Sequence, residues 1–413
     1  MKTINDTFEK VYLICDTDKN AIEYTPGETV KFEIKLYGDD ELISAPFIEY
    51  ELCADEDKNN KTHEYVSAES GVIRVEYTTS KPCFVKLNAF VCDSEKKRID
   101  IKYPLYAGAC AGFDEIRQHK DEPADFDEFW AKSLALLPTI ESVAARVQVR
   151  ELSGIAPEGY KSFEVMVPAV NDNTRPATAI MTYPENAKEG TLKLRCAFQG
   201  YGITPPAATY MPDYICFSVS SHGFAIGQPD YYYNYDYLGL QGFGFKNNDK
   251  PETVYFRNMI LRDVQMVRYA MTSKLWNGKD LWCAGGSMGA FQTSAVSALL
   301  NDVVTEVSVF INWMCDIGGE EIRINGWRPQ FTDALKYYDT VNFAKRIKAP
   351  INIAEAGLGD YVSPPSGIAC YFNEVKAKGQ TSIKATFIQN RSHGGDTHPA
   401  GVEQRRFSKE FNK

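Results

Sequence analysis

The stretch Asp280-Leu-Trp-Cys-Ala-Gly-Gly-Ser287-Met-Gly289-Ala-Phe-Gln292 decides the fold that this chain is expected to adopt. It begins with a short apolar run, which predicts a strand, and continues through a glycine-rich turn around Ser287. Apolar residues then recur at helical spacing, at Phe291, Ala295, Val296, Ala298 and Leu299. The stretch therefore predicts a strand, a tight turn and a helix, with a serine inside the turn.

Gly285, Ser287 and Gly289 form the pattern G-x-S-x-G. Between a strand and a helix, this pattern is typical of the nucleophile elbow of α/β-hydrolases. The flanking glycines let neighbouring backbone approach closely, and the strained turn exposes the serine hydroxyl. The backbone N–H of Met288 is then expected to face an oxyanion that develops during acyl transfer. Because G-x-S-x-G also occurs in ordinary Gly/Ser loops, the flanking strand and helix carry the assignment.

Length and composition limit the classes of protein that remain. A chain of 413 residues predicts two domains. The net charge of −10, without a block of Lys and Arg, argues against a nucleic-acid partner. No apolar run reaches the length of a membrane span, and the N-terminal residues lack the apolar centre of a signal peptide, so we expect a cytoplasmic protein that is not bound to a membrane. The ten cysteines contain no CxxC pair and are expected to be buried, reduced thiols, although a disulfide in the N-terminal part stays open.

Residues 1–110 are expected to form an all-β domain. Apolar and polar residues alternate at 30–36, 48–52 and 73–77, and turn-forming residues separate these runs. Short strands at this spacing predict a small antiparallel sandwich of immunoglobulin-like size. His, Asp and Ser residues do not converge here, so we expect a structural role or a contribution to the entrance of the second domain. Carbohydrate binding is the alternative.

Residues 111–413 are expected to form an α/β domain. An apolar helical stripe runs from 126 to 137, and a second helix is expected at 252–273. Strand-like runs lie at 147–151, 163–167, 177–183, 192–198, 215–219, 303–311, 351–354 and, as the last strand, 383–388. This alternation predicts the α/β-hydrolase fold, a mostly parallel sheet with helices on both faces. Ligands of such sheets bind at the carboxyl ends of the strands.

A serine hydroxyl becomes a good nucleophile only when a base removes its proton. In α/β-hydrolases the partners follow the serine in the order Asp or Glu, then His. Asp360 directly follows an expected strand, so it is the predicted carboxylate, and Asp316 is the alternative. Only His393 and His398 lie after Ser287. His393 follows the last expected strand in a glycine-containing loop and is the predicted base, with His398 as the alternative.

The second oxyanion N–H normally comes from the loop after an earlier strand. Gln199-Gly-Tyr-Gly202 occupies that place, so the backbone N–H of Tyr201 is the predicted partner of Met288, unless the segment is a plain glycine turn. Aromatic residues form a second candidate group: Trp313, Trp327 and the tyrosines at 231–233, 235 and 237. They are expected either to line a sugar-binding cleft or to pack a lid and the domain interface.

Four segments resemble the acetyl xylan esterase / cephalosporin C deacetylase family. They are Pro123-Ala-Asp-Phe-Asp-Glu-Phe-Trp130, Gly285-Gly-Ser-Met-Gly289, Asn342-Phe-Ala-Lys-Arg-Ile-Lys-Ala-Pro350 and Gly357-Leu-Gly-Asp-Tyr-Val-Ser-Pro-Pro-Ser366. The resemblance implies a serine esterase without a metal or other cofactor that removes acetyl groups from xylo-oligosaccharides and other small acetylated compounds. It assigns catalytic roles to Ser287, Asp360 and His393, and an oxyanion contact to the N–H of Tyr201.

The chain also departs from this family. Members commonly carry Arg-Gly-Gln-Gly where this chain has Ser220-Ser-His-Gly223, and the N-terminal domain lies outside the resemblance. Many members are ring-like hexamers, so a homo-oligomer is implied, but the additional domain leaves the assembly open.

The predicted function is a serine carboxylesterase that forms an acetyl-enzyme intermediate. One alternative is a serine peptidase of the prolyl-oligopeptidase type, which also combines a β domain with this fold. The other is a carbohydrate-binding protein with an inactive hydrolase domain. The acyl length, the sugar and the oligomeric state stay open at this stage.

Overall fold

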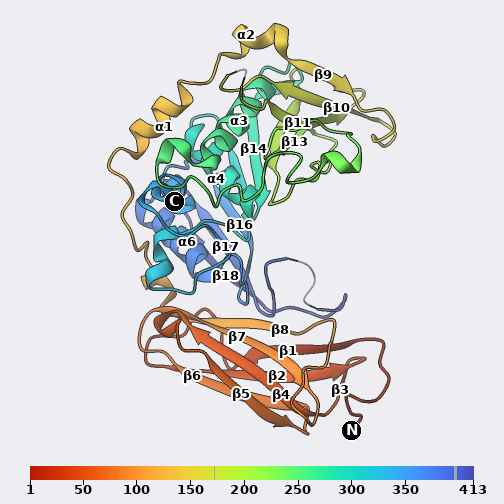
Figure 1. Cartoon of the computed structure of the whole chain (residues 1–413), viewed down its shortest axis with the longest axis vertical. Coiled ribbons are helices and arrows are strands. Elements are labelled where there is room, and N and C mark those ends of the chain that lie inside the picture. Colours follow the sequence, from red (N-terminus) through yellow and green to blue (C-terminus); the bar gives the residue numbers. More distant parts are fainter. Residues whose placement is uncertain (172, 395–397) are drawn as a thin grey trace.

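The computed structural model describes residues 1–171, 173–394 and 398–413. Figure 1 shows a β-rich N-terminal part below a larger sheet that is accompanied by helices. Across the described ranges, none of the helices has the length and apolar character needed to cross a membrane.

The N-terminal part consists of two antiparallel sheets. One contains β1 (Val11–Thr17), β2 (Thr29–Gly38), β3 (Glu41–Leu42) and β6 (Val72–Thr78). The other has the order β5 (Thr62–Ala68), β4 (Ala45–Ala54), β7 (Cys83–Cys92) and β8 (Leu105–Ala111). Every second residue of β2 from Val30 to Leu36 is buried, which is the alternation seen in the sequence. β1 and β8 are edge strands of their sheets, and both lie near the larger domain.

The larger sheet has ten strands in the order β18-β17-β16-β15-β14-β12-β13-β11-β10-β9. Their bounds are β9 (Gln148–Glu151), β10 (Tyr160–Val167), β11 (Ala177–Pro184), β12 (Leu192–Phe198), β13 (Tyr214–Ser220), β14 (Trp276–Gly286), β15 (Glu306–Phe310), β16 (Ile351–Gly357), β17 (Ile383–Ile388) and β18 (Arg406–Phe411). Strands β12 to β17 pair in parallel, and the outer strands pair antiparallel. The sheet is therefore mixed, with a parallel centre whose carboxyl ends share one edge.

The α-helices are α1 (Phe126–Leu134), α2 (Ile140–Val143), α3 (Tyr255–Ala270), α4 (Met288–Leu299), α5 (Thr340–Ala344) and α6 (Pro365–Lys378). Short 3₁₀ segments are η1 (Asp55–Asp57), η2 (Phe113–Glu115), η3 (Ala144–Arg146), η4 (Asp230–Tyr232), η5 (Pro251–Thr253), η6 (Ile317–Glu321) and η7 (Asp333–Tyr338). Helices α3, α4 and α6 contact the sheet, and α3, α4, α5 and α6 contact one another in series. These helices form a single layer.

The expectation of helices on both faces of the sheet is wrong for the described residues. Alternate strand residues such as Cys196, Cys283 and Val309 are buried against the helix layer, whereas Arg195 and Phe310 on the opposite face stay partly exposed. The connection between β12 and β13 contains three prolines, which lack the N–H that a helix needs. The described part of the connection between β17 and β18 is likewise not helical.

The expectation that 383–388 is the last strand is also wrong. β18 pairs antiparallel with β17 in full register from Ile383 and Phe411 to Ile388 and Arg406. Phe407 is the only buried residue of β18. The alternation of buried and exposed residues that marks a strand is therefore weak in this segment. Pairing with β17, rather than local pattern, makes this segment a strand.

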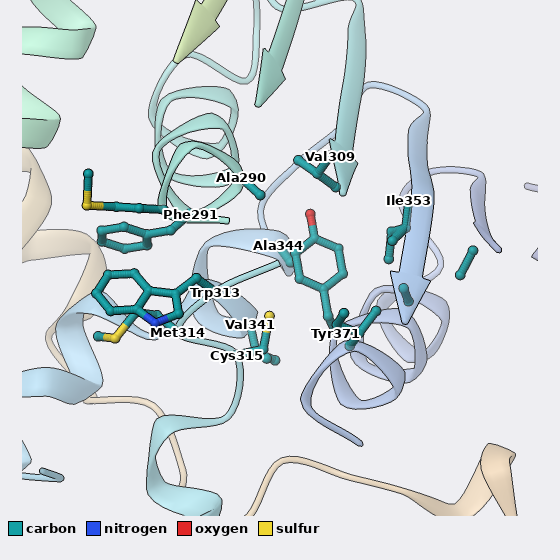
Figure 2. Packing of buried hydrophobic residues seen from close by; sticks show 14 of the residues in the cluster. Ala290, Phe291, Val309, Trp313, Met314, Cys315, Val341, Ala344, Ile353 and Tyr371 are labelled. Carbon is teal, nitrogen blue, oxygen red and sulfur yellow. The ribbon is translucent and has the colours of Figure 1, made fainter. Parts of the chain in front are cut away.

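The core under the parallel strands is aromatic. The ring of Phe291 on α4 lies 6.3 Å from the ring of Trp313, and Figure 2 shows the two side by side. Tyr371 on α6 reaches toward α4, where its hydroxyl lies 3.3 Å from Ser294 Oγ. This packing fixes α4, whose first turn follows Ser287, against the sheet.

Candidate active site

Ser287 lies in the turn between β14 and α4. Its φ of 54° and ψ of −122° are unfavourable for a residue with a side chain, which is the strain expected of a nucleophile elbow. A Cβ on Gly289 would lie 2.2 Å from the carbonyl oxygen of Phe198 on β12. A Cβ on Gly285 would lie 2.4 Å from the carbonyl oxygen of Gly289. The two glycines of the pattern are thus required by close backbone contacts.

Ser287, His393 and Asp360 form a continuous chain of polar contacts. Ser287 Oγ lies 2.9 Å from His393 Nε2. His393 Nδ1 lies 2.9 Å from Asp360 Oδ2 and 3.2 Å from Asp360 Oδ1. With Asp360 accepting a hydrogen bond from Nδ1, Nε2 is left free to accept the serine proton, so the arrangement is suited to nucleophilic catalysis.

Asp360 is buried and held rigidly. Its Oδ1 accepts hydrogen bonds from the backbone N–H groups of Val362 at 2.7 Å and Ser363 at 2.9 Å. The loop after β16 also bonds to the loop after β17, because the N–H of Gly359 donates to the carbonyl of Arg391 at 3.0 Å. The loops that carry the carboxylate and the imidazole are therefore joined directly.

The alternative residues have other partners. The carboxylate of Asp316 pairs with Arg323 and accepts a hydrogen bond from the backbone N–H of His119 at 2.9 Å. His398 Nδ1 lies 3.3 Å from Gln404 Nε2, and burial, followed by the charge of Arg391, lowers the pKa of His398 to about 4. The structure brings His393, rather than His398, to Ser287.

Met288 is the first residue of α4, and N–H groups of a first helical turn have no partner within their own helix. Tyr201 lies in the loop after β12. The carbonyl of Gln199 at the start of that loop accepts hydrogen bonds from Ser221 Oγ at 2.9 Å and from Gln292 Nε2 at 2.8 Å. These bonds orient the loop, and the oxyanion role of the Met288 and Tyr201 N–H groups stays a prediction.

Sequence reasoning did not identify Ser221, Gln292 or His222 as site residues. His222 is fully buried, with Nδ1 2.7 Å from the hydroxyl of Tyr255, and burial lowers its pKa to about 3. Its ring lies 4.5 Å from that of Phe243, which in turn stacks on Tyr201 at 4.8 Å. The departure from the family pattern at Ser220-Ser-His-Gly223 was the sequence feature that could have drawn attention to Ser221 and His222.

The aromatic candidates lie in three different environments. Trp313 is buried and belongs to the core, whereas Trp327 is 43% exposed. Trp327 lies 4.7 Å from the ring of Tyr201 and 5.2 Å from that of Phe245, which is also exposed. In the loop after β13, the tyrosines at 231, 232, 233 and 237 contact one another, and Tyr231 and Tyr237 are exposed. Tyr235 interacts instead with Tyr201. Trp327, Phe245 and Tyr201 thus form an aromatic group beside the predicted oxyanion loop.

A cavity of about 370 Å³ reaches the serine from the face of the sheet that lacks helices. Its lining includes Ser287, Gly200, Gly286, Phe310 and Ile311. The ring of Phe310 covers Gly286 so closely that a Cβ there would lie 2.1 Å from it. The lining is mostly apolar, with Arg195 as its charged member.

Comparison with known proteins identifies the family. A sequence model described as acetyl xylan esterase (AXE1) matches residues 111–318 and 328–398, which is more than half of the chain. The chain belongs to the acetyl xylan esterase family. It is therefore a carboxylic ester hydrolase of the α/β-hydrolase esterase type, as the four sequence segments implied.

One curated relative in this family is the acetyl esterase Axe7A of Xylanibacter ruminicola. It is 22% identical over 384 residues, which cover 87% of this chain and 82% of the relative. The match therefore extends beyond the residues that the family model covers.

Two solved acetyl xylan esterases share the fold. The enzyme from Paenibacillus sp. R4 has a TM-score of 0.54 at 17% identity and covers 68% of this chain and 93% of its own. The enzyme from Thermoanaerobacterium sp. JW/SL YS485 has a TM-score of 0.51 at 18% identity and covers 69% and 93%. At such low sequence identities, these structural similarities show that the fold is shared and do not bear on the function.

Proposed function

We propose that this esterase removes acetyl groups through a catalytic triad of Ser287, His393 and Asp360. The observation that carries the proposal is the chain of contacts from Ser287 Oγ through the imidazole of His393 to the carboxylate of Asp360. The same three side chains are the ones for which the order along the sequence predicts these roles.

In the proposed reaction, Ser287 Oγ attacks the acetyl carbonyl while His393 Nε2 takes the serine proton. Asp360 keeps His393 in the tautomer that can accept this proton and stabilises the imidazolium that forms. The N–H groups of Met288 and Tyr201 donate to the oxyanion. His393 then protonates the leaving alcohol, and water hydrolyses the acetyl-enzyme by the same steps.

The proposed substrates are small acetyl esters, including acetylated xylo-oligosaccharides. The cavity beside Ser287, which is lined by Phe310, Ile311 and several glycines, offers a largely apolar space for the acyl group. The exposed rings of Trp327 and Phe245 offer apolar faces for a sugar ring. The relative in Xylanibacter ruminicola is named an acetyl esterase, which supports the same acyl group.

The test is a panel of p-nitrophenyl acetate, butyrate and octanoate together with acetylated xylo-oligosaccharide and an aminoacyl-anilide. We expect rapid release from the acetate, slower release from longer esters, and free acetic acid from the oligosaccharide. The Ser287→Ala variant is the matched control and should lose nearly all turnover. Preference for the octanoate or the anilide would reject the proposed substrate class while leaving Ser287 as the nucleophile.

A further inference from the structure

One edge strand of each N-terminal sheet, β1 or β8, forms hydrogen bonds with the same loop of the catalytic domain. On β1, the N–H of Cys15 donates to Asn390 Oδ1 at 2.9 Å, and Asn390 Nδ2 donates to the carbonyl of Cys15 at 3.0 Å. An edge strand has free N–H and C=O groups that a neighbouring strand would normally pair. The side-chain amide of Asn390 takes the place of such a strand.

The neighbouring residue does the same on the other sheet. The N–H of Gly108 on β8 donates to Gln389 Oε1 at 3.0 Å, and Gln389 Nε2 donates to the carbonyl of Gly108 at 3.0 Å. Gln389 and Asn390 are both almost completely buried. Two consecutive amides therefore bind one strand of each N-terminal sheet, and loss of either would leave buried backbone groups without partners.

The loop that carries Asp360 lies against the same strand. A Cβ on Gly108 would lie 2.4 Å from the carbonyl oxygen of Leu358, and a Cβ on Gly359 would lie 2.3 Å from the carbonyl carbon of Tyr106. Backbone thus packs on backbone at a distance that only glycines allow. Gly359 immediately precedes Asp360.

These contacts lie very close to the two triad partners of Ser287. Asn390 precedes His393 by three residues and has a φ of 62°, a conformation that asparagine tolerates better than most residues. Figure 1 shows strands β16 and β17, which lead into the two loops, pointing toward β7 and β8. The N-terminal strands therefore support both loops at the carboxyl ends of β16 and β17.

We propose that the N-terminal β domain is a positioning part of the active site, and that Gln389 and Asn390 transmit its support to His393 and Asp360. This inference rests on the proposed triad. A small displacement of a catalytic group from its productive position lowers the rate of the chemical step, although the substrate still binds. Gln389 and Asn390 are positioning residues because they act through the loop and do not touch the reacting atoms.

The experiment compares full-length Gln389→Met and Asn390→Gly, singly and together. Methionine keeps the length of glutamine without its amide, and glycine keeps the positive φ of Asn390. Arg405→Ala is the matched control, because Arg405 Nη1 also joins the two domains through the carbonyl of Thr17 at 3.1 Å. The substitution removes this side-chain contact and keeps the Arg405 carbonyl, which accepts the N–H of Gln389 at 2.9 Å. The readouts are kcat and KM with p-nitrophenyl acetate and the pH profile of kcat/KM.

A second readout does not depend on the acyl group. Diethyl p-nitrophenyl phosphate should react with Ser287, which takes the phosphoryl group as p-nitrophenolate leaves, at a rate that reports the geometry of Ser287 and His393. If the wild-type chain reacts with this probe but does not hydrolyse acetyl esters, the proposed function fails while the labelling rates still test the domain's role.

We expect the double variant to lose about tenfold or more in kcat and in labelling rate, with KM changed by less than about twofold. The acid limb of its pH profile should shift, because that limb reports the base of the free enzyme. The control should stay within about twofold of the wild type. The proposal is overturned if folded variants match the wild type, or if Arg405→Ala loses as much activity. Should the double variant fail to fold, Gln389→Met alone decides by the same criteria.

Discussion

Trp313 and Trp327 lie with their rings 5.9 Å apart and nearly parallel, and Trp313 Nε1 donates a hydrogen bond to the carbonyl of Trp327 at 2.6 Å. One indole is buried in the core and the other is exposed beside Tyr201. The buried indole therefore anchors the exposed one and reduces the freedom that Trp327 would lose on binding a ligand.

We expect Trp327→Ala to raise KM for acetylated xylo-oligosaccharide by about two- to tenfold, because an aromatic contact contributes about 0.5–1.5 kcal/mol. Turnover of p-nitrophenyl acetate should change by less than about twofold, since that substrate carries no sugar. The measurement is a pair of steady-state curves. Tyr65→Ala on β5 of the N-terminal part is the control, and an equal loss on both substrates would exclude a sugar contact at Trp327.

Asp360→Asn should lower kcat for p-nitrophenyl acetate by about 10³- to 10⁴-fold while the protein stays folded. The amide can still accept the N–H groups of Val362 and Ser363, but its NH₂ group would face His393 Nδ1 and favour the wrong tautomer. Circular dichroism tests whether the variant is folded, and steady-state kinetics on the same sample measure its kcat. A loss below tenfold would mean that another carboxylate orients His393.

Lys86→Met should stabilise the protein at pH 7. Burial lowers the pKa of Lys86 from 10.5 to about 8, although the charge of Asp360 opposes this fall. Between these pH values the unfolded chain holds a proton that the folded chain has lost, so the stability of the wild type rises from pH 8 to 10.5. After a discount for partial exposure, the gain at pH 7 is about 1–3 kcal/mol.

The gain from Lys86→Met should shrink as the pH approaches 10.5, where the lysine is neutral in both states. Urea unfolding at pH 7 and pH 10 measures this difference. A gain that does not depend on pH would point to packing against the ring of Tyr361, which lies 5.4 Å from Lys86 Nζ, instead of charge burial.

Gly289→Ala should destabilise the elbow by about 1–3 kcal/mol, since the new methyl group would meet the backbone carbonyl of Phe198, which cannot move aside without shifting β12. Gly200→Ala is the control, because its nearest atom would be 3.6 Å away. Thermal unfolding compares the two. Equal melting temperatures would show that the backbone at the elbow adjusts more easily than its contacts imply.

The local pattern around Ser287 was sufficient to predict the strand, turn and helix of the elbow, and the family resemblance at its glycines is confirmed. The helix-free face was not predictable in this way, because the alternation of strands and helices along the chain does not show which face of the sheet each helix covers. β18 was missed because pairing with β17 creates it, and its own alternation is weak.

Sequence alone determined the family, the esterase class and the residue types available for catalysis, because these depend on short segments whose spacing is visible along the chain. Only the tertiary structure decided that His393, rather than His398, contacts Ser287, that Trp327 is exposed while Trp313 is buried, and that Gln389 and Asn390 reach two separate sheets. These outcomes join atoms that lie up to 375 residues apart, so they depend on packing between distant segments, which no local pattern records.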